Sequence, residues 1–154
     1  MVRSFSFSGL SVEDIGPAFP LVNAEHPGID ATTWRSFALP LVDAPASSLQ
    51  GICGMRNEAG YLCGLMVYRV ASDLHHGPLL AVDLLVAVDL VNQGAAALAL
   101  LHGAEEKAHE LDCQALRIQV GVQRKALART VKAAGFCAEA QSFCKRASAR
   151  LLPT

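Results

Sequence analysis

Residues 78–96 read PLLAVDLLVAVDLVNQGAA, and this stretch decides the fold. Its first part, residues 79–88, is a nearly continuous apolar run, as expected for a central strand that is covered on both faces. From Asn92 to Leu111 apolar residues recur with helical periodicity, and the many alanines favour a helix that packs closely on a sheet. The stretch therefore predicts a strand, a turn and the start of the longest helix.

Shorter elements are expected before this stretch. Residues 3–8 alternate polar and apolar side chains, which predicts a first strand with one buried face. A helix is expected over residues 11–21, with a serine cap and acids in its first turn. A second helix begins near Thr32 and ends near Leu39, because Pro40 disfavours helical geometry in the residue before it.

The remaining elements complete an alternating pattern. Residues 50–56 and 61–70 read as a hairpin, residues 116–120 as a strand after the long helix, residues 123–134 as a helix and residues 138–147 as a last strand. The order is thus β-α-α-β-β-β-α-β-α-β. The fold class is α/β, with a mixed sheet whose N-terminal half is antiparallel and whose crossover runs through the long helix.

Composition bounds the organisation of the chain. Its 154 residues predict a single domain over 1–154, and no linker or internal repeat interrupts them. Apolar residues make up 52% of the chain, which suggests that a second subunit covers part of the surface, as in a homodimer. The net charge is −1 and the 13 Lys and Arg are scattered, so a nucleic acid is not expected as a partner.

Membrane insertion, secretion and metal binding are not expected either. The longest apolar stretch, residues 79–91, is interrupted by Asp83 and Asp89 and is too short to span a membrane. The first residues lack a signal-peptide pattern, so we expect a cytoplasmic protein. The cysteines are odd in number, widely spaced and set in apolar segments, which favours core residues over disulfides or zinc ligands: Cys53, Cys63, Cys113, Cys137 and Cys144.

With this order of elements, the sequence resembles the GNAT superfamily of N-acetyltransferases over nearly the whole chain. Members of that family carry Q/R-x-x-G-x-G/A where the central strand gives way to the long helix. Gly94 and Ala96 fit the last two positions, whereas Val91 stands where the family has Gln or Arg. The resemblance implies that acetyl-CoA binds at this turn, where backbone N–H groups of a helix start hold its pyrophosphate.

A second motif of the family, like N-x-x-A-x-x-L-Y-x-x-x-G-F, aligns with residues 124–136. Gly135 and Phe136 agree with it, but Arg124 takes the Asn position and Val131 the position of the Tyr that commonly protonates the departing CoA thiolate. Another general acid, or water, is then needed. Main-chain groups of the central strand, a turn and one basic side chain are the implied cofactor-binding set: Leu84, Leu85, Val86, Val91, Asn92, Gln93, Gly94, Ala95, Ala96 and Arg124.

The chemistry that the resemblance implies is direct attack of an amine on the thioester, without a covalent enzyme intermediate. Asp83 is the candidate general base, since burial of a carboxylate raises its pKa toward neutrality. The alternative for Asp83 is a structural carboxylate that hydrogen-bonds nearby backbone. Asp89 is interpreted as a helix-start residue. For Arg124, contact with a CoA phosphate stands against an exposed position at a helix start.

Two histidines and three aromatic residues leave alternatives open. His75 and His76 precede the central strand, where they either border an acceptor pocket or lie exposed in a polar loop. Trp34, Phe37 and Tyr68 belong to the core or to the wall of that pocket, and their spacing does not decide which.

Two functions follow from these residues. The first is an acetyl-CoA-dependent N-acetyltransferase that acts on a primary amine, with an acceptor the sequence does not identify. The second is a catalytically degenerate GNAT-like domain that binds CoA or has a regulatory role, as Val91 and Val131 suggest.

Overall fold

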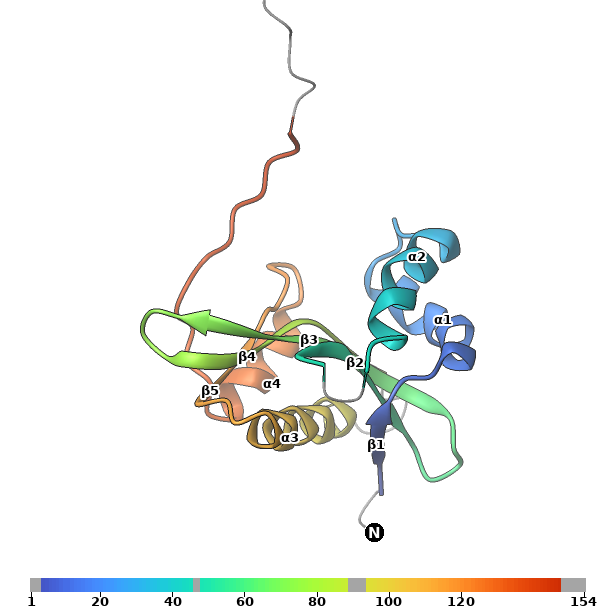
Figure 1. Ribbon diagram of the computed structural model, residues 1–154, viewed down its shortest axis with the longest axis horizontal. Helices are drawn as coiled ribbons and strands as arrows, with labels where there is room; N and C mark the ends of the chain where they lie inside the picture. The colour runs from blue at the N-terminus through green and yellow to red at the C-terminus, as the bar shows by residue number, and fades with distance from the viewer. Residues whose placement is uncertain (1–3, 46–47, 89–93, 148–154) are drawn as a thin grey trace, which may run out of the picture.

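The computed structural model describes residues 4–45, 48–88 and 94–147, and its elements form a five-stranded sheet with helices on both sides (Figure 1). The strands lie in the order β1-β2-β3-β4-β5. Neighbours from β1 to β4 are antiparallel, and β4 and β5 are parallel. In chain order the elements are β1 (Ser6–Gly9), the short 3-10 helix η1 (Val12–Asp14), α1 (Ile15–Glu25), α2 (Ala31–Val42), β2 (Gln50–Arg56), β3 (Leu62–Asp73), β4 (Gly77–Ala87), α3 (Ala95–Glu110), β5 (Ala115–Ile118) and α4 (Lys125–Ala133).

This architecture confirms the predicted α/β class and its mixed sheet. The hairpin is β2–β3, the central apolar strand is β4, and the long helix α3 carries the chain across to β5. β4 is buried on both faces, as its apolar sequence predicted, with Leu79, Leu80 and Val82 fully buried.

Two apolar clusters hold the layers together. Under one face, α3 and α4 pack Leu100, Leu101 and Leu127 against the sheet. Over the other face, α1 and α2 contribute Val22 and Trp34. The sheet serves both clusters because successive side chains of a strand point to opposite faces. In Figure 1, α1 and α2 accordingly lie on one side of the sheet and α3 on the other.

Residue 83 interrupts the alternation in β4. Opposite it, Val67 pairs with Leu84 and the next residue, Tyr68, pairs with Val82, so Asp83 is an extra residue that forms a β-bulge. Val82 packs in the α3–α4 cluster and so does Leu85, three positions later. The bulge therefore shifts the inward and outward pattern by one residue halfway along β4.

The three aromatic residues separate. Trp34 is buried among the side chains of the α1–α2 cluster, and its indole Nε1 donates a hydrogen bond of 2.9 Å to the Ile15 carbonyl. Tyr68 is buried in the α3–α4 cluster. Phe37, by contrast, lies on the surface of α2 with half of its area exposed. Trp34 and Tyr68 are thus core residues.

The predicted last strand over 138–147 is wrong. These residues form no strand, and every side chain from Cys137 to Ala147 is exposed. The alternation in this segment is carried mainly by alanines, which bury too little apolar area to fix a strand on the sheet edge. Figure 1 shows the segment running away from the domain after α4.

The predicted end of the second helix is also wrong. α2 continues through Pro40 to Val42, and the Asp43 N–H still donates to the Leu39 carbonyl at 3.0 Å. Pro40 removes a single N–H donor in the last turn. Apolar packing outweighs that loss, because Leu39, Leu41 and Val42 all lie against the α1–α2 cluster. β1 overlaps only the second half of the predicted first strand.

Candidate functional site

The strand β4 separates from β5 halfway along its length. The two pair from Leu79 and Ala115 to Val82 and Ile118, and the Gln119 N–H then donates to the Val82 carbonyl at 2.9 Å. β4 continues to Ala87. Beyond Val82, no strand among the described residues pairs with β4 on the side of β5. The main chain of Leu84, Leu85 and Val86 thus borders an opening between the strands. Leu85 and Val86 have no exposed area, main chain included, so other groups cover this edge of β4 in the structure.

Arg124 fills part of this opening. It is the N-cap residue of α4, and its guanidinium Nη1 donates to the Leu85 carbonyl at 2.7 Å. Its Nε lies 2.9 Å from Oε2 of Glu25, the last residue of α1. The Arg124 side chain is 17% exposed and that of Glu25 is 30% exposed. One side chain therefore joins α1, β4 and α4.

The start of α3 lies at the same opening. Gly94 is the N-cap residue, with φ 96° and ψ −16°, a left-handed conformation that favours glycine. Its carbonyl accepts the first helical hydrogen bond, from the Leu98 N–H at 2.8 Å. The N-terminus of this 16-residue helix carries a partial positive charge and attracts anions. Val91, Asn92 and Gln93 lie outside the described residues.

A pocket of about 340 Å³ connects these features. This volume lies at the low end of the range that is typical of small-molecule sites. Arg124 and Lys125 place two cations in its wall against the single carboxylate of Glu25. The lining comes from α1, β4, α3 and α4: Glu25, Ala87, Gly94, Ala97, Gln123, Arg124, Lys125, Ala126, Leu127 and Thr130. The structure therefore brings Gly94 and Arg124 together in one pocket, and CoA binding by these two residues stays a prediction.

Asp83 lies at the bulge, beside the opening, and is not in the pocket wall. Its Oδ2 accepts a hydrogen bond from Nε of Arg69 on β3 at 2.8 Å. The side chains are 38% and 49% exposed. The burial that the candidate base was expected to have is thus absent. An acceptor from solvent can reach the carboxylate, which is hydrogen-bonded to an arginine rather than to backbone.

Val131, which takes the place of the family's tyrosine, is a core residue with 7% exposure in the α3–α4 cluster. Thr130 beside it lines the pocket, and its hydroxyl donates to the Ala126 carbonyl at 3.2 Å.

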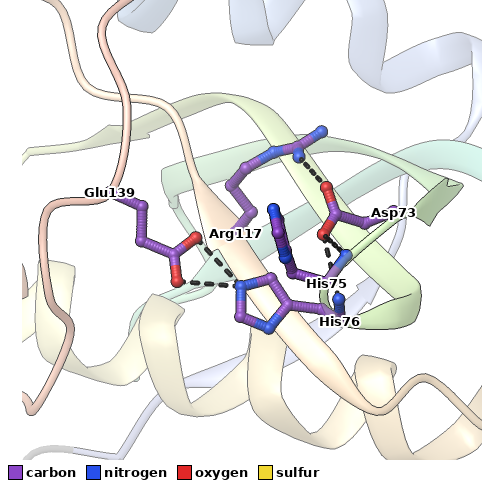
Figure 2. Close-up of polar contacts among 5 residues, drawn as sticks. All are labelled: Asp73, His75, His76, Arg117 and Glu139. Atoms are coloured by element: carbon purple, nitrogen blue, oxygen red, sulfur yellow. Dashed lines mark hydrogen bonds and ion pairs between the residues drawn. The ribbon is translucent and has the colours of Figure 1, made fainter.

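His75 and His76 lie at the other end of β4, in the turn after β3. Both backbone N–H groups donate to Oδ2 of Asp73 at 3.0 Å, and Nε2 of His76 lies 2.8 Å from Oε1 of Glu139 (Figure 2). Arg117 of β5 pairs with the second oxygen of Asp73 at 3.6 Å. β4 runs its full length between this cluster and the pocket, roughly 30 Å of extended chain. The histidines therefore do not border the pocket.

Sequence reasoning missed Glu25, Lys125 and Thr130 as pocket residues. Lys125 and Thr130 lie in the predicted helix next to Arg124, so a pattern search around that residue would have found them. Glu25 comes from a distant helix, and no local pattern indicates its contact. No group of three or more side chains suited to a metal, and no helix able to cross a bilayer, occurs within 4–45, 48–88 and 94–147.

The overall fold recurs in solved structures. An aminoglycoside N-acetyltransferase AAC(6')-Iy in complex with CoA superposes with a TM-score of 0.78 at 10% identity, over 96% of this chain and 97% of that one. This chain has the GNAT fold. The ribosomal-protein-alanine N-acetyltransferase of Brucella melitensis shares that fold at a TM-score of 0.71 and 19% identity, over 93% of this chain and 99% of its own.

A transcriptional regulator from Bacillus halodurans has the same GNAT fold, with a TM-score of 0.75 and 12% identity over 93% of this chain and 99% of that one. The sequence matches no protein-family model and no curated protein. At these identities the likeness establishes the fold, and function has to be argued from the pocket.

Proposed function

We propose that this protein is an acetyl-CoA-dependent N-acetyltransferase that acylates a primary amine. The observation that carries the proposal is the pocket, which connects the open edge of β4 to the left-handed Gly94 at the start of α3. The GNAT fold supports it, because one similar structure is an N-acetyltransferase in complex with CoA and another is described as a ribosomal-protein-alanine N-acetyltransferase.

In the proposed complex the pyrophosphate lies at the N-terminus of α3, against the backbone of Ala95 and Ala96. The helix dipole and the nearby Lys125 ammonium favour its negative charge. The pantetheine arm lies along the free edge of β4, where the main chain of residues 84–86 offers donors and acceptors as a neighbouring strand would. Val91 adds no polar group, and the backbone cradle does not require one.

The chemical step joins the amine nitrogen to the thioester carbonyl carbon and breaks the carbon–sulfur bond. The amine must lose a proton, and the CoA thiolate must gain one. We assign the first role to Asp83, whose carboxylate is open to solvent beside residues 84–86. Backbone N–H groups of the splayed strand polarise the carbonyl. Because Val131 replaces the family's tyrosine, the thiolate takes its proton from water in this proposal.

A second candidate is a GNAT-like domain that binds CoA without efficient turnover. The buried Val131 favours it, because no phenol stands at that place, and the similar transcriptional regulator has the same fold. The homodimer and the cytoplasmic location expected from the sequence stay predictions for either function.

Calorimetric titration with acetyl-CoA tests what both candidates share. Saturable binding with one site per chain is expected, and no binding up to high micromolar ligand would refute both. Release of free thiol in the presence of a panel of primary amines separates them. Turnover on any amine supports the enzyme, and tight CoA binding without turnover on the whole panel supports the binding domain.

A further inference from the structure

The guanidinium of Arg124 occupies a place that the proposed ligand needs. Nη1 lies 2.7 Å from the Leu85 carbonyl, on the edge of β4 that β5 leaves open. A pantetheine arm that runs along this edge as a strand would bring an amide N–H to the same carbonyl. Arg124 and the arm therefore compete for one acceptor and for the space beside it.

Hydrogen bonds hold the backbone of Arg124 in place, whereas its guanidinium can contact more than one partner. Its N–H donates to the Gly121 carbonyl at 2.9 Å, and its carbonyl accepts from the Ala128 N–H at 3.0 Å. The guanidinium is held in its present place by two contacts, the Leu85 carbonyl and the Glu25 carboxylate. Glu25 thus stabilises the position in which Arg124 covers the edge of β4.

A second position for the guanidinium exists along the same pocket wall. Gly94 at the start of α3, and Lys125, both line the pocket that Arg124 lines. An anion held by the N-terminus of α3 lies within the cavity that the Arg124 side chain borders. Arginine is suited to this contact, because its planar guanidinium binds phosphate oxygens with two parallel hydrogen bonds.

We propose that Arg124 is an exchange residue: it covers the Leu85 carbonyl as the structure shows, and it moves to a phosphate of acyl-CoA when the pantetheine arm takes that carbonyl. Glu25 holds the covering position and so opposes ligand binding. This inference rests on the proposed acyl-CoA function. It makes Arg124 a binding residue that favours a phosphorylated donor over an unphosphorylated one.

Two variants of the full-length chain test the exchange with two ligands, acetyl-CoA and S-acetylpantetheine, which lacks the phosphates. Glu25→Gln removes the anchor and is expected to tighten both ligands about threefold, the effect of a partly exposed ion pair. Arg124→Ala frees the carbonyl but loses the phosphate contact, so S-acetylpantetheine binds more tightly and acetyl-CoA about tenfold more weakly. Both dissociation constants are measured on one preparation, so their ratio does not depend on the folded fraction.

Glu110→Gln is the matched control, because it removes one exposed carboxylate that pairs with Lys107 and does not line the pocket, so both affinities should stay unchanged. If the wild type binds acetyl-CoA and Glu25→Gln binds it no more tightly than Glu110→Gln, the exchange is refuted and the proposed function stands. The exchange is also refuted if Arg124→Ala leaves S-acetylpantetheine unchanged or weakens both ligands equally. If neither the wild type nor Glu25→Gln binds acetyl-CoA, the exchange and the proposed function fail together.

Discussion

The two ends of the segment from Asp83 to Gly94 are built differently. At Gly94 the site consists of main chain, namely a left-handed turn and a helix N-terminus that line a pocket. At Asp83 it consists of one carboxylate, partly exposed and paired with Arg69 of the neighbouring strand. A main-chain site tolerates changes of neighbouring side chains, such as Val91, whereas a side-chain site depends on its surroundings. The proposed CoA binding is therefore expected to tolerate substitutions that would abolish the proposed catalysis.

The largest expected effect comes from Gly94→Val, which changes the main-chain conformation at the Gly94 end of the segment. A side chain at φ 96° costs about 1–2 kcal/mol of folding stability, and it also displaces the turn that we propose as the pyrophosphate site. Acetyl-CoA binding should disappear from calorimetric titrations. Gly135→Val is the matched control, because Gly135 has φ 101° and no atoms within 4 Å of an added Cβ, at the far end of α4. Equal loss of affinity in both variants would show that strain alone is responsible.

Asp83→Asn tests the side-chain end. If Asp83 accepts the proton of the amine, kcat should fall about a hundredfold, while the dissociation constant of acetyl-CoA stays the same. Asp14→Asn provides the comparison, because Asp14 also pairs with an arginine, Arg56, at 2.6 Å, but far from the pocket. Steady-state kinetics on both variants decide the question. An unchanged kcat in Asp83→Asn would make the Arg69 pair purely structural.

Asp14 is expected to act on stability instead. Burial raises the pKa of its carboxyl, but hydrogen bonds from the Ser11 backbone and hydroxyl, and the Arg56 guanidinium, outweigh burial and lower that pKa below 3.8. A lowered folded-state pKa contributes stability above the unfolded value, and this contribution is lost as the pH falls through the folded-state pKa. Urea denaturation should show Asp14→Asn to be about 1 kcal/mol less stable at pH 6, with the difference shrinking toward pH 3. A difference that persists at pH 3 would point to lost packing.

The smallest effect is expected at the opposite end of β4. Glu139→Gln removes the carboxylate beside His76, in a pair whose side chains are 37% and 57% exposed. The free energy of unfolding should change by less than about 0.5 kcal/mol, and kcat and acetyl-CoA affinity should not change. Denaturation and kinetics of Glu139→Gln beside His76→Ala check this. A loss of activity in both would place the histidines in the working site after all.

The sequence predicted the part of the fold that local signals determine. The apolar run of β4 and the alanine-rich periodicity of α3 are each contained in one short stretch, so the strand, turn and helix were predicted together with Gly94. For Arg124 the sequence left a CoA phosphate contact or an exposed helix start open, and in the structure its guanidinium contacts Glu25 and the Leu85 carbonyl. Those partners come from other elements, and no spacing in the sequence indicates them.

The wrong predictions lie where contacts between residues far apart in the sequence determine the structure. The strand over 138–147 has a suitable alternation but no neighbour to pair with in the structure, and α2 passes Pro40 because packing outweighs one lost hydrogen bond. The exposure of Asp83 depends on how β3 pairs with β4, because the extra residue is defined only by the register of its partner strand. A propensity read along one strand contains no information about that register.

The bulge at residue 83 also affects how this chain tolerates insertions and deletions. Before the bulge, even-numbered residues such as Val82 face α3. After it, odd-numbered residues such as Leu85 do. Deleting Asp83 would thus leave the other residues of β4 on their present faces, because Val82 and Leu84 already pair with the consecutive residues Tyr68 and Val67 of β3. An alignment of this strand with a related one should place any gap at position 83, because elsewhere in β4 a gap turns buried leucines toward solvent.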